Sequence, residues 1–199
     1  MGMDVYGVNP TIRVGTKKPA EIDFQKSSDA EQKKYFAEER EFENKNVGVY
    51  FRNNCWWWRP LANFIIEKCD WVTQEQKERL HDNSGFEFSQ HEAVTIADTL
   101  QKPVDDGTAA EREKMNKREM AVAEEWNKGI HAQQEELEKE VIKETGDAKI
   151  VPYDYPEPFK KKWDDLQKSE DRRASYPFKE ANVKEFICFL RECGGFKVC

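Results

Sequence analysis

The chain has 199 residues, of which 36% are charged and 12% aromatic, and its formal net charge is −7. The aromatic content argues against a disordered chain, because disordered segments are depleted in aromatic residues. No apolar run approaches the roughly 18 residues that a membrane-spanning helix needs, and an isoelectric point near 5.2 disfavours a basic nucleic-acid-binding domain. Residues 1–9 contain neither the apolar run nor the basic leader of a signal peptide. We therefore expect a soluble, cytoplasmic protein that contacts no membrane and binds no nucleic acid directly.

The cysteines indicate reduced thiols. The chain has an odd number of cysteines, and no two of them form a CxxC pair. They are Cys55, Cys69, Cys188, Cys193 and Cys199. Such a pattern does not resemble a disulfide framework, and the spacings of five and six residues between the last three differ from those of structural zinc sites. Buried thiols then behave as small apolar side chains. We expect no bound cofactor.

Aromatic and charged residues occupy different parts of the chain. Residues 47–71 contain four of the six tryptophans, residues 105–149 are almost continuously charged, and residues 176–199 are again aromatic and apolar. We expect residues 1–104 and 176–199 to form one core domain. Residues 105–175 are expected to form a charged helical insertion that includes a proline-rich linker.

Capping residues and apolar periodicity predict a series of helices. Ser28, Thr73 and Ser89 are suited to cap a helix, Pro60 suits the first turn of another, and Gly194–Gly195 suits a left-handed helix stop. Pro103 and the turn at 105–107 end the helix that Ser89 caps. The predicted helices cover residues 28–44, 60–69, 73–81, 89–102, 108–144 (as one helix or two), 159–168 and 183–193.

Short alternating segments at residues 3–6, 86–88 and 195–199 predict strands, and the first two are the expected pairing partners of the last. Together with the helices they predict an α+β fold that is mostly α. In this fold a helical core carries a small two- or three-stranded antiparallel sheet and a long charged helical excursion.

Three consecutive tryptophans, Trp56, Trp57 and Trp58, stand between Arg52 and Arg59. On a helix, consecutive side chains point about 100° apart, so the three indoles cannot all enter one core face. An aromatic core at the junction of several elements is the favoured interpretation. A protein-recognition surface is the main alternative, because Trp and Arg are frequent interface anchors. Base stacking on single-stranded nucleic acid is a third, which the acidic composition disfavours.

The predicted helix over 108–144 has a narrow apolar stripe that includes Trp126, and the rest of its surface is charged. A narrow stripe indicates packing against one partner, within a hairpin or on another protein, and self-association through residues 108–144 is one form of this. A second hypothesis is an acidic face that mimics DNA, which needs rows of carboxylates without nearby lysines. The interleaved lysines favour an ordinary solvated helix. The candidate acidic residues are Glu124, Glu125, Glu135, Glu136 and Glu138.

The segment around residues 81–92 partly resembles a calcium-binding loop between two helices. Asp82, Ser84 and Gly85 match alternate ligand positions and the turn glycine, and Glu92 is the candidate closing ligand. Leu80 stands where the first aspartate belongs, and one extra residue follows Gly85. A helix–turn–helix connection capped by Ser89 is therefore the favoured interpretation, and a small metal-binding or enzymatic module is the alternative.

Signatures of enzymes are missing from the sequence. It has no phosphate-binding glycine loop, dinucleotide fingerprint, HExxH pair or nucleophile elbow. Its carboxylates alternate with lysines, as in residues 111–114, which is typical of a solvated helix face. We expect a protein without enzymatic activity.

Several blocks in combination resemble a family of small, functionally uncharacterised phage and prophage proteins. They cover roughly half of the chain and are MGMDVYG and NP at residues 1–10, YFRNN at 50–54, WRPL at 58–61, NSG at 83–85, YPF at 176–178, NV at 182–183, EF at 185–186, FL at 189–190 and GGF at 194–196. The resemblance implies a phage-related context and no particular activity. We therefore expect an accessory protein that binds a host or phage protein in the host cytoplasm, with inhibition of a host defence system as one version. A structural or assembly component that pairs through its long helix is a further alternative.

Overall fold

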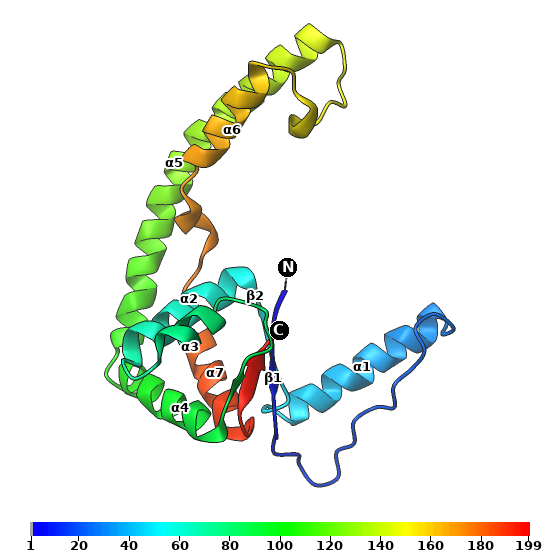
Figure 1. Ribbon diagram of the computed structural model, residues 1–199, viewed down its shortest axis with the longest axis vertical. Helices are drawn as coiled ribbons and strands as arrows, with labels where there is room; N and C mark the ends of the chain where they lie inside the picture. The colour runs from blue at the N-terminus through cyan, green and yellow to red at the C-terminus, as the bar shows by residue number, and fades with distance from the viewer. Residues whose placement is uncertain (1) are drawn as a thin grey trace. The chain divides into compact units, whose positions relative to one another are not determined.

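The computed structural model describes residues 2–199 (Figure 1). Its helices are α1 (Asp29–Lys45), α2 (Cys55–Lys68), α3 (Gln74–Arg79), α4 (Gln90–Asp105), α5 (Thr108–Thr145), α6 (Phe159–Ser169) and α7 (Glu180–Glu192), with 3-10 turns η1 (Pro152–Asp154) and η2 (Arg172–Ser175). The strands are β1 (Gly2–Gly7), β2 (Tyr50–Asn54), β3 (Glu87–Phe88) and β4 (Phe196–Val198). The predicted α+β, mostly α fold is confirmed. The sheet has four strands, however, and not two or three.

The chain divides into two compact units, which we describe separately. Unit 1 comprises the residues up to Glu113 together with Phe178–Cys199, and unit 2 comprises Lys114–Pro177. None of the helices within residues 2–199 is long and apolar enough to cross a membrane.

The sheet of unit 1 is antiparallel, with the strand order β2-β1-β4-β3. Val5 of β1 pairs with Phe51 of β2 on one side and with Val198 of β4 on the other. The strand that was not predicted is β2, which forms one edge of the sheet. The C-terminal strand β4 lies inside the sheet because β1 and β3 pair with its two sides.

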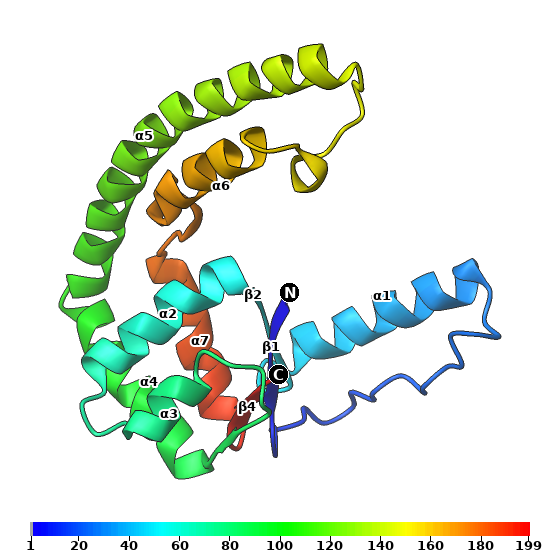
Figure 2. The same cartoon turned by 45° about the horizontal axis from the view of Figure 1, so that its top comes forward.

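Helices α2, α4 and α7 pack together beside this sheet, as Figure 2 shows. Their apolar faces and the inward face of the sheet share one core. Phe186 of α7 lies 5.0 Å from Phe51 and 5.5 Å from Trp58, measured between ring centroids. Phe88 and Phe196 stack at 4.5 Å. Aromatic residues from distant parts of the chain thus join the sheet to the helices.

Local signals define most helix ends. Ser28, Thr73 and Ser89 each form a capping box, in which the side chain of the cap and the residue three positions later exchange hydrogen bonds with the backbone. The prediction for Pro60 was wrong, because α2 begins five residues earlier at Cys55, capped by Asn54. Pro103 likewise lies within the last turn of α4 and does not end it.

Unit 2 contains the greater part of α5 and the α6 segment that packs against it. Buried apolar side chains of α5 form the contact face, at Ala123, Ile130, Leu137 and Val141. Asn127 donates to the carbonyl of Asp171 (3.0 Å) and accepts from its backbone N–H (2.8 Å). Residues 108–145 form one continuous helix, so the alternative of two helices in sequence is wrong.

Candidate functional site

The three tryptophans divide as helical geometry requires. Trp58 is fully buried, and its indole N–H donates to the carbonyl of Leu80 at 2.6 Å. Trp56 remains 47% exposed on the opposite side of the helix, and Trp57 is half-buried. One indole therefore serves the core, and the other two reach the surface.

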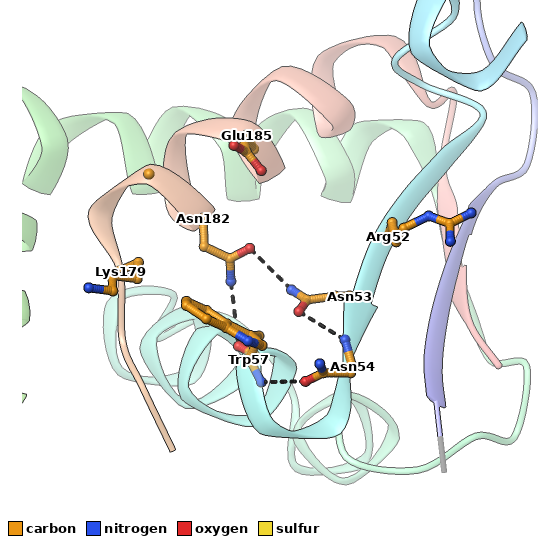
Figure 3. A pocket seen from close by; sticks show the side chains of 8 residues that line it. Arg52, Asn53, Asn54, Trp57, Lys179, Asn182 and Glu185 are labelled. Atoms are coloured by element: carbon orange, nitrogen blue, oxygen red, sulfur yellow. Dashed lines mark hydrogen bonds between the residues drawn. The ribbon is translucent and has the colours of Figure 1, made fainter. Parts of the chain in front are cut away.

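A network of asparagine side chains joins β2, the start of α2 and the start of α7 (Figure 3). The Asn54 side chain accepts hydrogen bonds from the backbone N–H groups of Trp56 and Trp57, at 3.0 and 3.1 Å. Asn53 donates to Asn182 at 3.2 Å, and Asn182 donates to the carbonyl of Trp57 at 3.4 Å. These bonds hold the two walls of a surface hollow in place.

This hollow has a volume of about 470 Å³. One wall is β2 with the first turn of α2, and the other is the first half of α7. Figure 3 shows Asn182 and Glu185 projecting from α7 and Trp57 from the opposite wall. Its lining residues are Arg52, Asn53, Asn54, Trp57, Lys179, Ala181, Asn182 and Glu185.

A second hollow of about 450 Å³ adjoins the first and is more apolar in its lining, which includes Val47, Phe51 and Phe189. Arg52 and Glu185 line both hollows. Together the two hollows form a groove along the outer side of β2, with α7 as the other wall, which we call the β2–α7 groove. All five residues of β2 line it.

The backbone of β2 presents a free edge to this groove. The N–H of Gly7 donates to the carbonyl of Val49. In this register the odd-numbered residues of β2, Phe51 and Asn53, therefore form the hydrogen-bonded pairs with β1. The even-numbered residues Tyr50 and Arg52 therefore direct their N–H and C=O groups away from β1. Because β2 is the end strand of the sheet, no further strand pairs with these groups within residues 2–199.

The charges around the groove are mostly paired within unit 1. Arg52 lies 3.5 Å from Glu43, Lys179 3.4 Å from Glu113, and Lys184 3.1 Å from Glu180. Burial raises the pKa of Glu43 although Arg52 opposes this shift. By contrast, no ion pair or hydrogen bond connects the exposed carboxylate of Glu185 to any other residue of the described range 2–199.

The outward face of the sheet carries a separate polar contact. The Tyr50 hydroxyl donates to Asp4, and the Arg52 guanidinium lies 5.3 Å from the centroid of the Tyr50 ring. Burial, followed by the hydrogen bond with Asp4, raises the pKa of Tyr50. These contacts hold the Arg52 guanidinium beside the Tyr50 ring. In Figure 3 its side chain extends away from the asparagine network.

Of the other predicted interaction residues, Arg59 is exposed on α2 of unit 1, and the rest belong to unit 2. Trp126 is 61% exposed, although its indole N–H donates to the carbonyl of Ser169 at 2.9 Å. Lys128 pairs with Glu125 at 2.7 Å, so the acidic face contains at least one neutralised position. All five predicted acidic side chains are exposed on α5, at Glu124, Glu125, Glu135, Glu136 and Glu138.

The side chains of Asp82 and Glu92, two of the candidate calcium ligands, accept local hydrogen bonds. Asp82 accepts from Arg79 and from the backbone N–H of Ser84, both at 3.1 Å, and the contacts with Ser84 lower the pKa of Asp82 most. Glu92 accepts from the backbone of Ser89 at 2.7 Å as part of the capping box. Among residues 2–199, no group of three or more His, Cys, Asp or Glu side chains is placed to hold a metal ion.

Comparison of the chain with family models, curated proteins and solved structures finds no match. Sequence reasoning singled out Arg52 and Trp57, and it missed β2 as a strand and Asn182 and Glu185 as the opposite wall of the groove. The alternation in YFRNN was a weak signal for β2, whereas no local signal connects residue 53 to residue 182.

Proposed function

We propose that this chain is a non-enzymatic accessory protein of phage origin, which binds a host or viral protein through the β2–α7 groove. Inhibition of a host defence system is one version of this function. The resemblance of its sequence blocks to phage and prophage proteins supports the phage context. Several of those blocks, YFRNN at 50–54, NV at 182–183 and EF at 185–186, contribute residues to the groove.

The observation that carries the proposal is the free edge of β2 at the border of a groove. Exposed strand edges are a hazard because they pair with other chains, and proteins commonly cover or shorten them. Here the edge is flanked by a half-buried indole, Trp57, and by the carboxamide of Asn182. Tryptophan is among the residues most enriched at the energetic centres of protein interfaces. The surface thus combines backbone hydrogen-bonding groups with an aromatic anchor.

The test is affinity capture from a host lysate with tagged protein, comparing wild type with Trp57→Ala. Trp56→Ala is the matched control, because Trp56 is the neighbouring indole and lines neither hollow. Trp126→Ala tests whether the exposed indole of unit 2 is used instead. Thermal unfolding of each variant establishes that it is folded.

We expect wild type and Trp56→Ala to capture the same partner. Trp57→Ala should capture at least tenfold less of it. A partner captured equally by Trp57→Ala and wild type, or no specific partner at all, contradicts binding through the groove. Loss of capture only in Trp126→Ala would assign the interaction to unit 2.

A second candidate function is self-association through α5, which an exposed apolar stripe favours. Met115, Val122 and Trp126 share one side of the helix and are 48%, 66% and 61% exposed. The helix is rich in basic residues over 112–118 and in acidic residues over 124–138. Antiparallel pairing of two copies would place these opposite charges side by side.

Mass measurement in solution tests this candidate. We expect a dimer at tens of micromolar that becomes a monomer in Val122→Glu, and a monomeric wild type would exclude it. Val14→Glu, another exposed apolar residue but outside α5, is the control and should leave the mass unchanged.

A further inference from the structure

The free edge of β2 identifies the kind of ligand that the groove accepts. We infer that the β2–α7 groove binds an extended peptide segment, which adds to the sheet as a fifth strand beside β2. This inference rests on the function proposed above and names the form of the bound partner.

The first argument is the spacing of hydrogen-bonding groups. Tyr50 and Arg52 each direct one N–H and one C=O to the outside of the sheet, two residues apart along β2. An added strand lies about 4.8 Å from the edge and meets such groups at alternate residues. The peptide backbone supplies matching donors and acceptors whatever its sequence, and strand addition of this kind is a recurring mode of peptide recognition.

The edge ends at Asn54. The backbone N–H of Asn54 donates to the side chain of Asn53 at 3.0 Å, and α2 begins at the next residue. At the other end, Gly48 packs directly against the backbone of Glu192 at the end of α7. The open edge is therefore about five residues long, which matches a short peptide segment and not a large sheet.

The second argument concerns the side chains of the peptide. Alternate residues of an added strand face the same side, so every second side chain would point toward α7. The hollow beside Val47, Phe51 and Phe189 suits an apolar side chain. The hollow beside Asn53 and Asn182 suits a polar one.

Charge complementarity predicts that the peptide side chain in the hollow beside Asn53 and Asn182 is basic. Glu185 lines both hollows, and its carboxylate has no hydrogen-bond or ion-pair partner within residues 2–199. The nearby cations Arg52, Lys179 and Lys184 are each within 3.5 Å of another carboxylate. A Lys or Arg side chain of the peptide would complete the pairing of Glu185. The predicted ligand is an extended segment with an apolar and a basic residue on the same face.

The experiment uses a displayed library of random twelve-residue peptides and the full chain as bait. Peptides selected on wild type are then synthesised. Their dissociation constants are measured with wild type and with two protein variants that differ only at Arg52. Arg52→Pro removes the outward N–H of β2, which proline tolerates at an edge strand because this N–H does not pair with β1. Arg52→Ala removes the same side chain and its contact with Glu43 but keeps the N–H.

If the peptide adds as a strand, Arg52→Pro should bind the selected peptides at least tenfold more weakly than Arg52→Ala. N-methylation of the peptide amides, scanned one residue at a time, should abolish binding with a period of two residues. This second measurement does not depend on the folding of any variant. Replacing the basic residue of the peptide with Glu should weaken binding at least tenfold, and Glu185→Lys should restore it.

Equal affinity of the selected peptides for Arg52→Pro and Arg52→Ala, or enrichment of no peptide, would overturn the inference. Its failure is distinguishable from failure of the proposed function. A lysate partner that requires Trp57 while no peptide binds would retain the groove as an interface and exclude an extended ligand. If neither a peptide nor a Trp57-dependent partner is found, both proposals are wrong.

Discussion

The side-chain amide of Asn53 in β2 donates a hydrogen bond of 3.2 Å to the side-chain carbonyl of Asn182 in α7, and 129 positions separate the two residues along the chain. The bond connects the two walls of the β2–α7 groove. Its partners are half-buried. The bond therefore links the stability of unit 1 to the shape of its candidate binding surface.

The first prediction concerns this pair. Asn53→Ala and Asn182→Ala should each lower the free energy of unfolding by about 1 kcal/mol, the usual net worth of one hydrogen bond. The double variant should be less destabilised than the sum of the two, because both remove the same bond. Urea unfolding measures all three values. Asn44→Ala, at an exposed position, is the control, and strict additivity would contradict a direct coupling.

The second prediction separates the tryptophans. Trp58→Phe keeps an aromatic ring in the core but removes the N–H that bonds to the buried carbonyl of Leu80. A buried acceptor without a donor should lower the free energy of unfolding by about 2 kcal/mol. Trp56→Phe should change it by less than about 0.5 kcal/mol, because Trp56 is at the surface. Equal effects of the two substitutions would argue against the assignment of Trp58 to the core.

The third prediction uses two glycines with opposite surroundings. A Cβ added to Gly48 would lie 2.2 Å from the carbonyl oxygen of Glu192. Gly48→Ala should therefore lower the free energy of unfolding by about 3 kcal/mol or more, because the segments around residues 48 and 192 must move apart. A Cβ added to Gly129 in α5 has no neighbour within 4 Å. Gly129→Ala should therefore stabilise the helix by up to about 1 kcal/mol. The midpoint of urea unfolding distinguishes the two signs, and a tolerated alanine at residue 48 would contradict the close approach.

The fourth prediction is a loss of stability in alkali. Burial raises the pKa of Cys69 and that of Cys193 to about 11, whereas an unfolded thiol has a pKa near 9. Between these values the unfolded chain releases protons that the folded chain keeps, so the free energy of unfolding falls as the pH rises. From pH 8 to pH 10 the loss should be about 1.3 kcal/mol for each thiol.

Urea unfolding at the two pH values measures this loss. Lysines and tyrosines also titrate in this range, so the informative quantity is the difference between wild type and the double variant Cys69→Ala/Cys193→Ala. The double variant should be less stable at pH 8 but should lose less stability at pH 10. A parallel decrease in both proteins would mean that the two thiols are not buried in the folded state.

The local sequence was sufficient to predict most helices. Capping boxes at Ser28, Thr73 and Ser89 involve residues only three positions apart, and the periodicity of α4 and α7 repeats within two or three turns. The stop at Gly194–Gly195 is equally local, since both residues adopt the positive φ that glycine favours. The same reasoning located β1, β3 and β4 from their alternation and correctly named β1 and β3 as the partners of β4, but it gave no information on the pairing of β1 with β2.

The composition is that of an acidic, aromatic-rich chain, and the sequence by itself determined most of its helices, its fold class and the unequal environments of its three tryptophans. Only the tertiary structure decided that β2 is an edge strand, that α7 forms the opposite wall of a groove, and that Glu185 has no partner within residues 2–199. The physical reason is the range of the interactions. Helices depend on contacts three or four residues apart, whereas a sheet edge and a groove depend on which distant segments the shared core brings together.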